Sequence, residues 1–162
     1  MSGPGEIRVG MARLAVAAGE ATLVSAGLGS CVAVALWDGR ARVGGLAHVM
    51  LPGPEFSRGA AEPARFAGTA VPRLLTLMAE RGAAGPITAR LAGGASMFRT
   101  LLAAGGVNIG ERNVVAARAA LAAAGVPLAA EDVGGGHGRS VWFDVHSGRL
   151  LVRSVTAGDR EL

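Results

Sequence analysis

Residues 25–37 read Ser-Ala-Gly-Leu-Gly-Ser-Cys-Val-Ala-Val-Ala-Leu-Trp, a glycine turn that runs directly into an apolar stretch. Cys31, the only cysteine of the chain, stands at the junction between the two. The stretch Val32–Trp37 has the length of a buried strand and ends at the turn signal Asp38-Gly39. The preceding glycines allow a sharp bend whose N–H groups approach another molecule. This placement suits a nucleophilic thiol, and it also suits an inert core cysteine.

Short strands are predicted on both sides of this stretch, bounded by glycine, proline and aspartate. Arg42–Leu51 follows the Asp38-Gly39 turn, so we expect it to form a hairpin with Val32–Trp37. The other expected strands are Glu6–Val9, Met11–Ala17, Thr22–Ser25, Ile87–Leu91, Leu128–Val133, Ser140–Val145 and Arg149–Val155.

Two helices are predicted in the middle of the chain. Apolar residues at spacings of three and four indicate a helix over Ala64–Arg81. A second helix is expected over Glu111–Ala124, with Asn108 or Gly110 as its N-cap. Strands joined by hairpins need their apolar face covered, and two helices can do this. We therefore predict an α/β fold of the α+β type, in which mixed or antiparallel β-sheets pack against two helices.

Length and composition point to one domain over residues 1–162. The net charge of +4 comes from arginines spread singly along the chain, without a basic run, which argues against nucleic-acid binding. One cysteine excludes an intrachain disulfide and a multi-cysteine metal site. Glu6 and Arg8 precede only a short apolar patch, so we expect no signal peptide, no membrane insertion and a cytoplasmic location.

Cys31 and His48 form the first candidate site. A neighbouring imidazole lowers the pKa of a thiol and then carries protons for the reaction. Pairing about the Asp38 turn predicts that Cys31 lies opposite a residue in the mid-forties, and a bulge or offset would bring His48 to the thiol. The Ser25 hydroxyl is a candidate to orient the imidazole. Spacing alone favours the alternative of a buried cysteine and an unrelated, hydrogen-bonded histidine, because both are common.

Backbone N–H groups of the glycine turn, at Gly29 and Ser30, are candidates for an oxyanion hole beside the thiol. Other constellations are weaker. The three histidines, His48, His137 and His146, show no metal-ligand spacing, so we expect no metal site. Ser30 and Ser96 are possible nucleophiles, but neither stands in a Gly-x-Ser-x-Gly motif.

Five blocks of sequence, read in order, add a resemblance to a known family. They are GLGSCVAV (27–34), GLAHVMLP (45–52), AGGASMF (92–98), NIGERNV (108–114) and EDVGG (131–135) with Arg139-Ser140. Together they resemble the CheD family of chemotaxis proteins, the chemoreceptor glutamine deamidases. The similarity runs from about Val9 to Val155, nearly the whole chain. Five blocks in one order are far more specific than a lone Gly-Ser-Cys.

The resemblance implies a fold of β-sheets on two helices, similar to the catalytic domain of the cytotoxic necrotising factor toxins. It implies Cys31 as nucleophile and His48 as general base, without a cofactor. Ser25 stands where the family usually has threonine as the third member. The implied substrates are glutamines in the cytoplasmic helical bundle of chemoreceptors, and a CheC-type phosphatase is an implied partner. The alternative is a non-catalytic adaptor that binds receptor and phosphatase.

Overall fold

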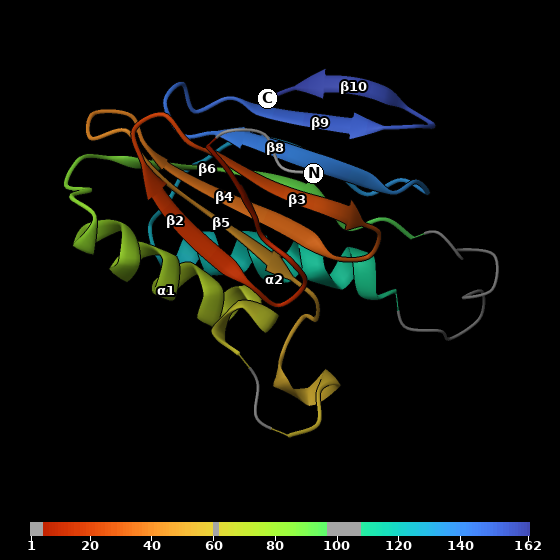
Figure 1. Ribbon diagram of the computed structural model, residues 1–162. Coiled ribbons are helices and arrows are strands. Elements are labelled where there is room, and N and C mark those ends of the chain that lie inside the picture. Colours follow the sequence, from red (N-terminus) through yellow and green to blue (C-terminus); the bar gives the residue numbers. More distant parts are fainter. Residues whose placement is uncertain (1–4, 60–61, 97–107) are drawn as a thin grey trace.

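A computed structural model describes residues 5–59, 62–96 and 108–162 (Figure 1). Met97 and Phe98 of the third sequence block lie outside these ranges. Within them the chain forms ten strands, two α-helices and two short 3-10 helices. The strands are β1 Glu6–Arg8, β2 Leu14–Ala18, β3 Thr22–Leu28, β4 Val32–Asp38, β5 Val43–Val49, β6 Ile87–Gly93, β7 Leu128–Val133, β8 Arg139–Asp144, β9 Leu150–Ser154 and β10 Gly158–Glu161. The helices are η1 Pro54–Phe56, η2 Pro63–Arg65, α1 Ala67–Glu80 and α2 Ile109–Ala123.

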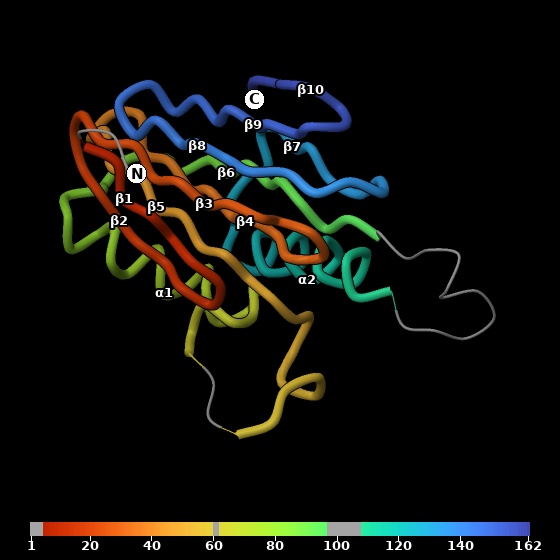
Figure 2. Tube along the Cα trace, turned by 45° about the vertical axis from the view of Figure 1, so that its right-hand side comes forward, coloured from red at the N-terminus to blue at the C-terminus, as the bar shows by residue number. Residues whose placement is uncertain are grey.

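The elements form three layers (Figures 1 and 2). The strands β2-β5-β4-β6-β7 make the middle sheet, and β1-β3-β8-β9-β10 make the outer sheet. Both helices lie on the face of the middle sheet that is turned away from the outer sheet. Each sheet contains one parallel pair, β6 with β7 and β1 with β3, so both are mixed. The predicted fold class and the pairing of two helices with one sheet face are confirmed.

The apolar run of β4 explains its central place in the middle sheet. Val32, Val34 and Leu36 belong to the core beneath the helices, whereas Ala33 and Ala35 belong to the core between the sheets. A strand that is buried on both faces reads as a continuous apolar run rather than an alternating one. The small alanines leave room for larger residues of the outer sheet, such as Leu23 and Phe143.

Helix positions agree with the predictions to within a few residues. The Asn108 side chain caps α2 by accepting a hydrogen bond from Glu111 N at 3.0 Å, as one of the two expected caps. The first helix begins three residues later than expected, because Phe66 is extended, with φ −124° and ψ 143°. Pro63–Arg65 forms a separate 3-10 turn before it.

The strand β10 was not predicted from the sequence. All four of its residues are exposed, so it has no apolar alternation to reveal it. Its backbone pairs with β9, and the Asp159 carboxylate accepts hydrogen bonds from the Arg153 guanidinium at 3.1 Å. Backbone pairing at a sheet edge needs no apolar pattern, and this is why the sequence does not indicate the strand.

Candidate active site

The candidate nucleophile, Cys31, lies at the end of the β3–β4 turn, one residue before β4, and is half-buried. Three successive carbonyl oxygens of this turn accept hydrogen bonds from residues outside it. Gly29 O accepts from Ala95 N at 2.8 Å, and Cys31 O accepts from Gly94 N at 2.8 Å. Ser30 O accepts from a side chain of α2, at 2.8 Å from Asn113 Nδ2. The turn that carries the thiol is therefore fixed by backbone and side-chain bonds rather than by packing alone.

The hairpin register places His48 on the same face as Cys31. Ala33 pairs with His48, and Cys31 lies two residues before Ala33, so both side chains point into the layer between the sheets. The β4–β5 register, continued by one step, sets Cys31 opposite Met50 and not opposite a residue in the mid-forties, as the sequence suggested. The reason is the turn, which spans four residues, 39–42, instead of two. His48 is thus a diagonal neighbour of Cys31, at a spacing of about 7–8 Å between backbones, and no bulge is needed.

Ser25, the third predicted member, meets His48 from the outer sheet. Ser25 Oγ lies 2.7 Å from His48 Nδ1, and it donates to the carbonyl oxygen of Val9 at 2.8 Å. Both side chains are buried, with exposed fractions of 0% for Ser25 and 1% for His48. Ser25 reaches inward because it shares the face of β3 that carries Leu23, while Gly27, at φ +69°, makes a bulge after it.

The hydrogen bonds define which imidazole nitrogen carries the proton. The Ser25 hydroxyl proton is committed to Val9 O, so Ser25 Oγ accepts from Nδ1–H of His48. The other nitrogen, Nε2, is buried and has no hydrogen-bond partner among the residues that the structure describes. It therefore keeps a free lone pair, which is the state that a general base needs. The Val9 carbonyl is a member of this arrangement that the sequence did not reveal, because backbone atoms carry no residue signature.

Burial governs the ionisation of both groups in the free protein. It lowers the pKa of His48, against a smaller opposing effect of the Val9 backbone. It also raises the pKa of Cys31, against a smaller opposing effect of the residue's own N–H. The expectation that the imidazole lowers the thiol pKa is thus not met in this state, since no hydrogen bond joins the sulfur to Nε2. Both pKa directions favour a neutral thiol and a neutral imidazole at neutral pH.

The two residues predicted to supply oxyanion-binding N–H groups, Gly29 and Ser30, lie in the β3–β4 turn. Within the described part of the chain, no acceptor is found for the N–H groups of Gly29 and Ser30, whereas the Gly27 N–H donates to Ser140 Oγ at 3.2 Å. Ser30 is exposed and Gly29 is partly exposed. Unpartnered N–H groups at an accessible turn beside a thiol can stabilise a developing negative charge.

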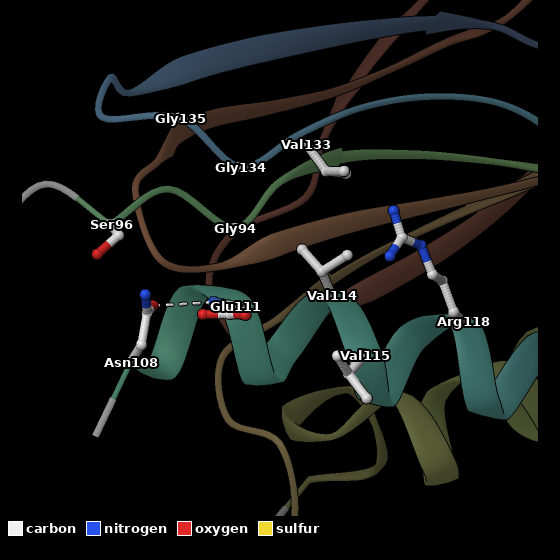
Figure 3. Close-up of a pocket in the computed structure, with 10 residues that line it drawn as sticks. All are labelled: Gly94, Ser96, Asn108, Glu111, Val114, Val115, Arg118, Val133, Gly134 and Gly135. Atoms are coloured by element: carbon white, nitrogen blue, oxygen red, sulfur yellow. Dashed lines mark hydrogen bonds between the residues drawn. The ribbon is translucent and has the colours of Figure 1, made fainter. Parts of the chain in front are cut away.

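A cavity of about 300 Å³ lies beside this arrangement, between α2 and the ends of β6 and β7 (Figure 3). Gly94 and Ser96 line one wall, and Glu111 and Arg118 of α2 line the other. Cys31 and His48 do not line it, but the lining residue Gly94 donates its backbone N–H to Cys31 O.

The other candidates are not brought together. His137 lies in the β7–β8 loop, and His146 lies in the β8–β9 turn against the Arg42 guanidinium, both away from His48. Among the described residues, no group of three histidine, cysteine, aspartate or glutamate side chains is placed to hold a metal ion. Ser96 Oγ and Ser30 have no histidine among their hydrogen-bond partners.

Comparison with known proteins identifies the family. Residues 50–154 match the family described as "CheD chemotactic sensory transduction". A protein of Geobacter metallireducens named "Probable chemoreceptor glutamine deamidase CheD 2" is 43% identical over 158 residues, which cover 96% of this chain and 98% of the relative. The chain belongs to the CheD family. Two further CheD relatives, from Moorella thermoacetica and Clostridium novyi, both named "Probable chemoreceptor glutamine deamidase CheD", are 41% and 39% identical. They cover 94% and 97% of this chain, and 92% and 98% of their own lengths.

Membership of the CheD family agrees with the resemblance in the five sequence blocks. The match at residues 50–154 begins just after β5, whereas the relatives also cover the segment that carries Ser25, Cys31 and His48. Over the described ranges, neither α-helix combines the length and apolar character required to cross a bilayer.

Proposed function

We propose that this protein is a protein-glutamine deamidase that converts glutamine side chains of chemoreceptors to glutamate. The relatives named as chemoreceptor glutamine deamidases support the reaction and the substrate class. The observation that carries the assignment of residues is the Ser25–His48 hydrogen bond. It leaves Nε2 of His48 as a free base on the face that also holds the Cys31 thiol.

The first half-reaction forms a thioester. The Cys31 thiol gives its proton to His48 Nε2, and the sulfur attacks the carboxamide carbon of the glutamine. The negative charge on the former carbonyl oxygen is stabilised by backbone N–H groups at Gly29, Ser30 and Cys31. The tetrahedral species collapses when the C–N bond breaks. The nitrogen takes the proton from His48 and leaves as ammonia.

The second half-reaction releases glutamate. A water molecule gives a proton to His48 Nε2 as its oxygen attacks the thioester carbon. The C–S bond then breaks and the sulfur recovers the proton from His48. The new carboxylic acid loses its remaining proton to solvent and becomes a carboxylate. Each half-reaction uses Nε2 of His48 first as a base and then as an acid. The proton on the other nitrogen, Nδ1, must therefore stay in place throughout, and the hydrogen bond to Ser25 keeps it there.

The resting state fits a thiol that is activated only during turnover. A neutral thiol and a neutral imidazole need no stabilising counter-charge when they are buried. Closure of the gap between sulfur and Nε2 on substrate binding would let the proton pass between them, since catalytic hydrogen bonds tighten in the bound state. The site would act in the cytoplasm, on the receptor's helical bundle, and a CheC-type phosphatase is the partner we expect to regulate it.

The test is a mass-spectrometric map of glutamine conversion in a purified receptor cytoplasmic fragment. The intact protein is expected to convert specific glutamines, and Cys31→Ala and His48→Asn are expected to convert none. Ser147→Ala, a change in the exposed β8–β9 turn, serves as a matched control and should behave as the unmodified protein. Equal conversion by the Cys31 variant would remove the thiol from the mechanism.

A non-catalytic adaptor is the second candidate. The raised pKa of Cys31 and the missing bond to Nε2 are the observations in its favour. An adaptor would bind the receptor fragment with the same affinity in the intact protein and in Cys31→Ala, and neither would convert glutamine.

A further inference from the structure

Asn113 of α2 is a buried polar side chain that joins both halves of the candidate site. Its exposed fraction is 1%. Its side-chain Nδ2 donates to Ser30 O at 2.8 Å and to Met50 O at 2.9 Å. Ser30 precedes the nucleophile in the chain, and Met50 lies two residues after His48, so one amide bridges the two strands that carry the reacting groups.

The residue type at this position is unusual for its place in the helix. The same face of α2 carries Val114, Ala117 and Leu121, all buried and apolar. Asparagine is a poor helix former, and burying its amide is costly unless it is hydrogen-bonded. Local rules are broken in this way mainly at functional sites. A leucine would fit the apolar pattern, so the amide has a task that packing does not explain.

The orientation of the amide follows from its two partners. Both are carbonyl oxygens, which only accept, so the NH₂ group must face them and Oδ1 must point away. Oδ1 is buried and has no partner within the described ranges, so the contacts of this amide are those of its two N–H donors.

The bond to Ser30 O sets the plane of the Ser30–Cys31 peptide group. In a trans peptide the C=O and N–H bonds point in opposite directions. With the Ser30 carbonyl turned to α2, the Cys31 N–H faces away from the helix. It lies against the residue's own thiol, where it opposes the effect of burial on the thiol pKa. An N–H group in this position also faces the oxygen of a carbonyl that the sulfur attacks.

We propose that Asn113 is a positioning residue of the site, which turns the Ser30–Cys31 peptide so that the Cys31 N–H faces the reacting oxygen. The bond to Met50 O ties the same side chain to the end of the His48 strand and keeps nucleophile and base in register. This inference rests on the proposed deamidase function, but its central claim, the orientation of one peptide group, can be tested without the receptor.

The test compares Asn113→Leu with Leu121→Ala. The first removes the donors and keeps the side-chain size. The second opens a cavity two turns further along the same buried face and leaves the Ser30 peptide untouched. Two readouts are needed: kcat and KM on a receptor fragment, and the pH midpoint of Cys31 alkylation by iodoacetamide.

We expect Asn113→Leu to lower kcat roughly 100-fold with KM within about twofold, and to shift the alkylation midpoint to higher pH. Leu121→Ala should lose stability but keep both kcat and the midpoint. Equal behaviour of the two variants, or an unchanged midpoint in Asn113→Leu, would overturn the proposal. If the intact protein fails to convert glutamine, the deamidase function is wrong, while the alkylation comparison still decides the role of Asn113.

A structure of the unmodified protein with a peptide aldehyde covers the case in which Asn113→Leu does not fold. The aldehyde replaces the glutamine carboxamide, so addition of the Cys31 thiol gives a hemithioacetal. The proposal requires its oxygen within hydrogen-bond distance of Cys31 N, with Asn113 Nδ2 still bound to Ser30 O. An oxygen bound elsewhere, with the Cys31 N–H turned away, would contradict it.

Discussion

Ser25 Oγ lies 2.7 Å from Nδ1 of His48 and 2.8 Å from the carbonyl oxygen of Val9. One hydroxyl thus links a strand of the outer sheet, a strand of the middle sheet and the segment after β1. Because its proton goes to Val9, it accepts from Nδ1–H and leaves Nε2 as the base. The direction of this chain, from imidazole to hydroxyl to carbonyl, is what makes the histidine useful to a thiol.

Removal of the Ser25 hydroxyl should therefore impair chemistry more than stability. In Ser25→Ala, Nδ1–H loses its acceptor and the imidazole can adopt the other tautomer, so we expect kcat to fall roughly 100-fold. Ser25→Thr keeps the hydroxyl and should retain most of the activity. Steady-state kinetics on a receptor fragment make the measurement. Wild-type kcat in Ser25→Ala would show that Ser25 has no orienting role.

The pH dependence of Cys31 alkylation should distinguish a neutral thiol and imidazole from a preformed thiolate–imidazolium pair. Burial raises the pKa of the thiol, so the iodoacetamide rate of the free protein should have its midpoint above the ordinary range for cysteine, about 8.5. Burial lowers the pKa of His48, so kcat/KM should fall only as the pH drops below 6.5 and the base becomes protonated. A thiol midpoint near neutrality would show a thiolate–imidazolium pair and contradict the neutral resting state.

The close approach of β6 to the nucleophile turn makes Gly93 sensitive to substitution. Its φ is +113°, and a Cβ there would overlap the carbonyl oxygen of Cys31. Gly125 also has a positive φ, +71°, but a Cβ added there would meet no atom within 4 Å, so Gly125 is the matched control. Gly125→Ala should cost about 1–2 kcal/mol of unfolding free energy from backbone strain alone. Gly93→Ala should lower the free energy of unfolding by more than this and should displace Cys31, so that activity is lost. Urea unfolding measures the stability of both variants, and kinetics on a receptor fragment measures their activity. An equal loss of unfolding free energy in the two variants would contradict the predicted overlap.

Asp38 should stabilise the fold through four backbone N–H groups. Its Oδ1 accepts from Arg40 N and Ala41 N, and its Oδ2 accepts from Ala84 N and Gly85 N, at 2.8–3.1 Å. The carboxylate thereby ties the β4–β5 turn to the loop before β6. Asp38→Ala leaves these donors without their acceptor, so we expect a loss of about 3 kcal/mol at neutral pH.

The effect of Asp38 should also depend on pH. Burial raises the pKa of its carboxyl, but the four N–H donors together outweigh this and hold the pKa below its usual value. The added stability is therefore present above the unfolded value of about 3.9 and is lost as the pH falls through the lower, folded value. Melting temperatures of the intact protein and Asp38→Ala should converge below about pH 4. A constant difference down to pH 2 would contradict the assignment.

Sequence patterns identified most of the strands, because β4 is a short apolar run that ends at a turn signal and β8 alternates between buried and partly buried residues. They did not show that the strands divide into two sheets, because pairings such as β3 with β8 join segments more than 100 residues apart. The all-exposed β10 has no apolar pattern and was missed. The four-residue β4–β5 turn also escaped prediction, and with it the register that makes His48 a diagonal neighbour of Cys31.

The sequence by itself determined the family, the α+β class and the identity of the three side chains proposed to form the site, since these depend on residue types and their order. Only the tertiary structure decided how those side chains meet. The tautomer of His48 depends on a backbone carbonyl, that of Val9, and the direction of the Cys31 N–H depends on an amide of α2 that is 82 residues further along the chain. Contacts of this kind are made between distant segments by packing, and no local pattern of residues encodes them.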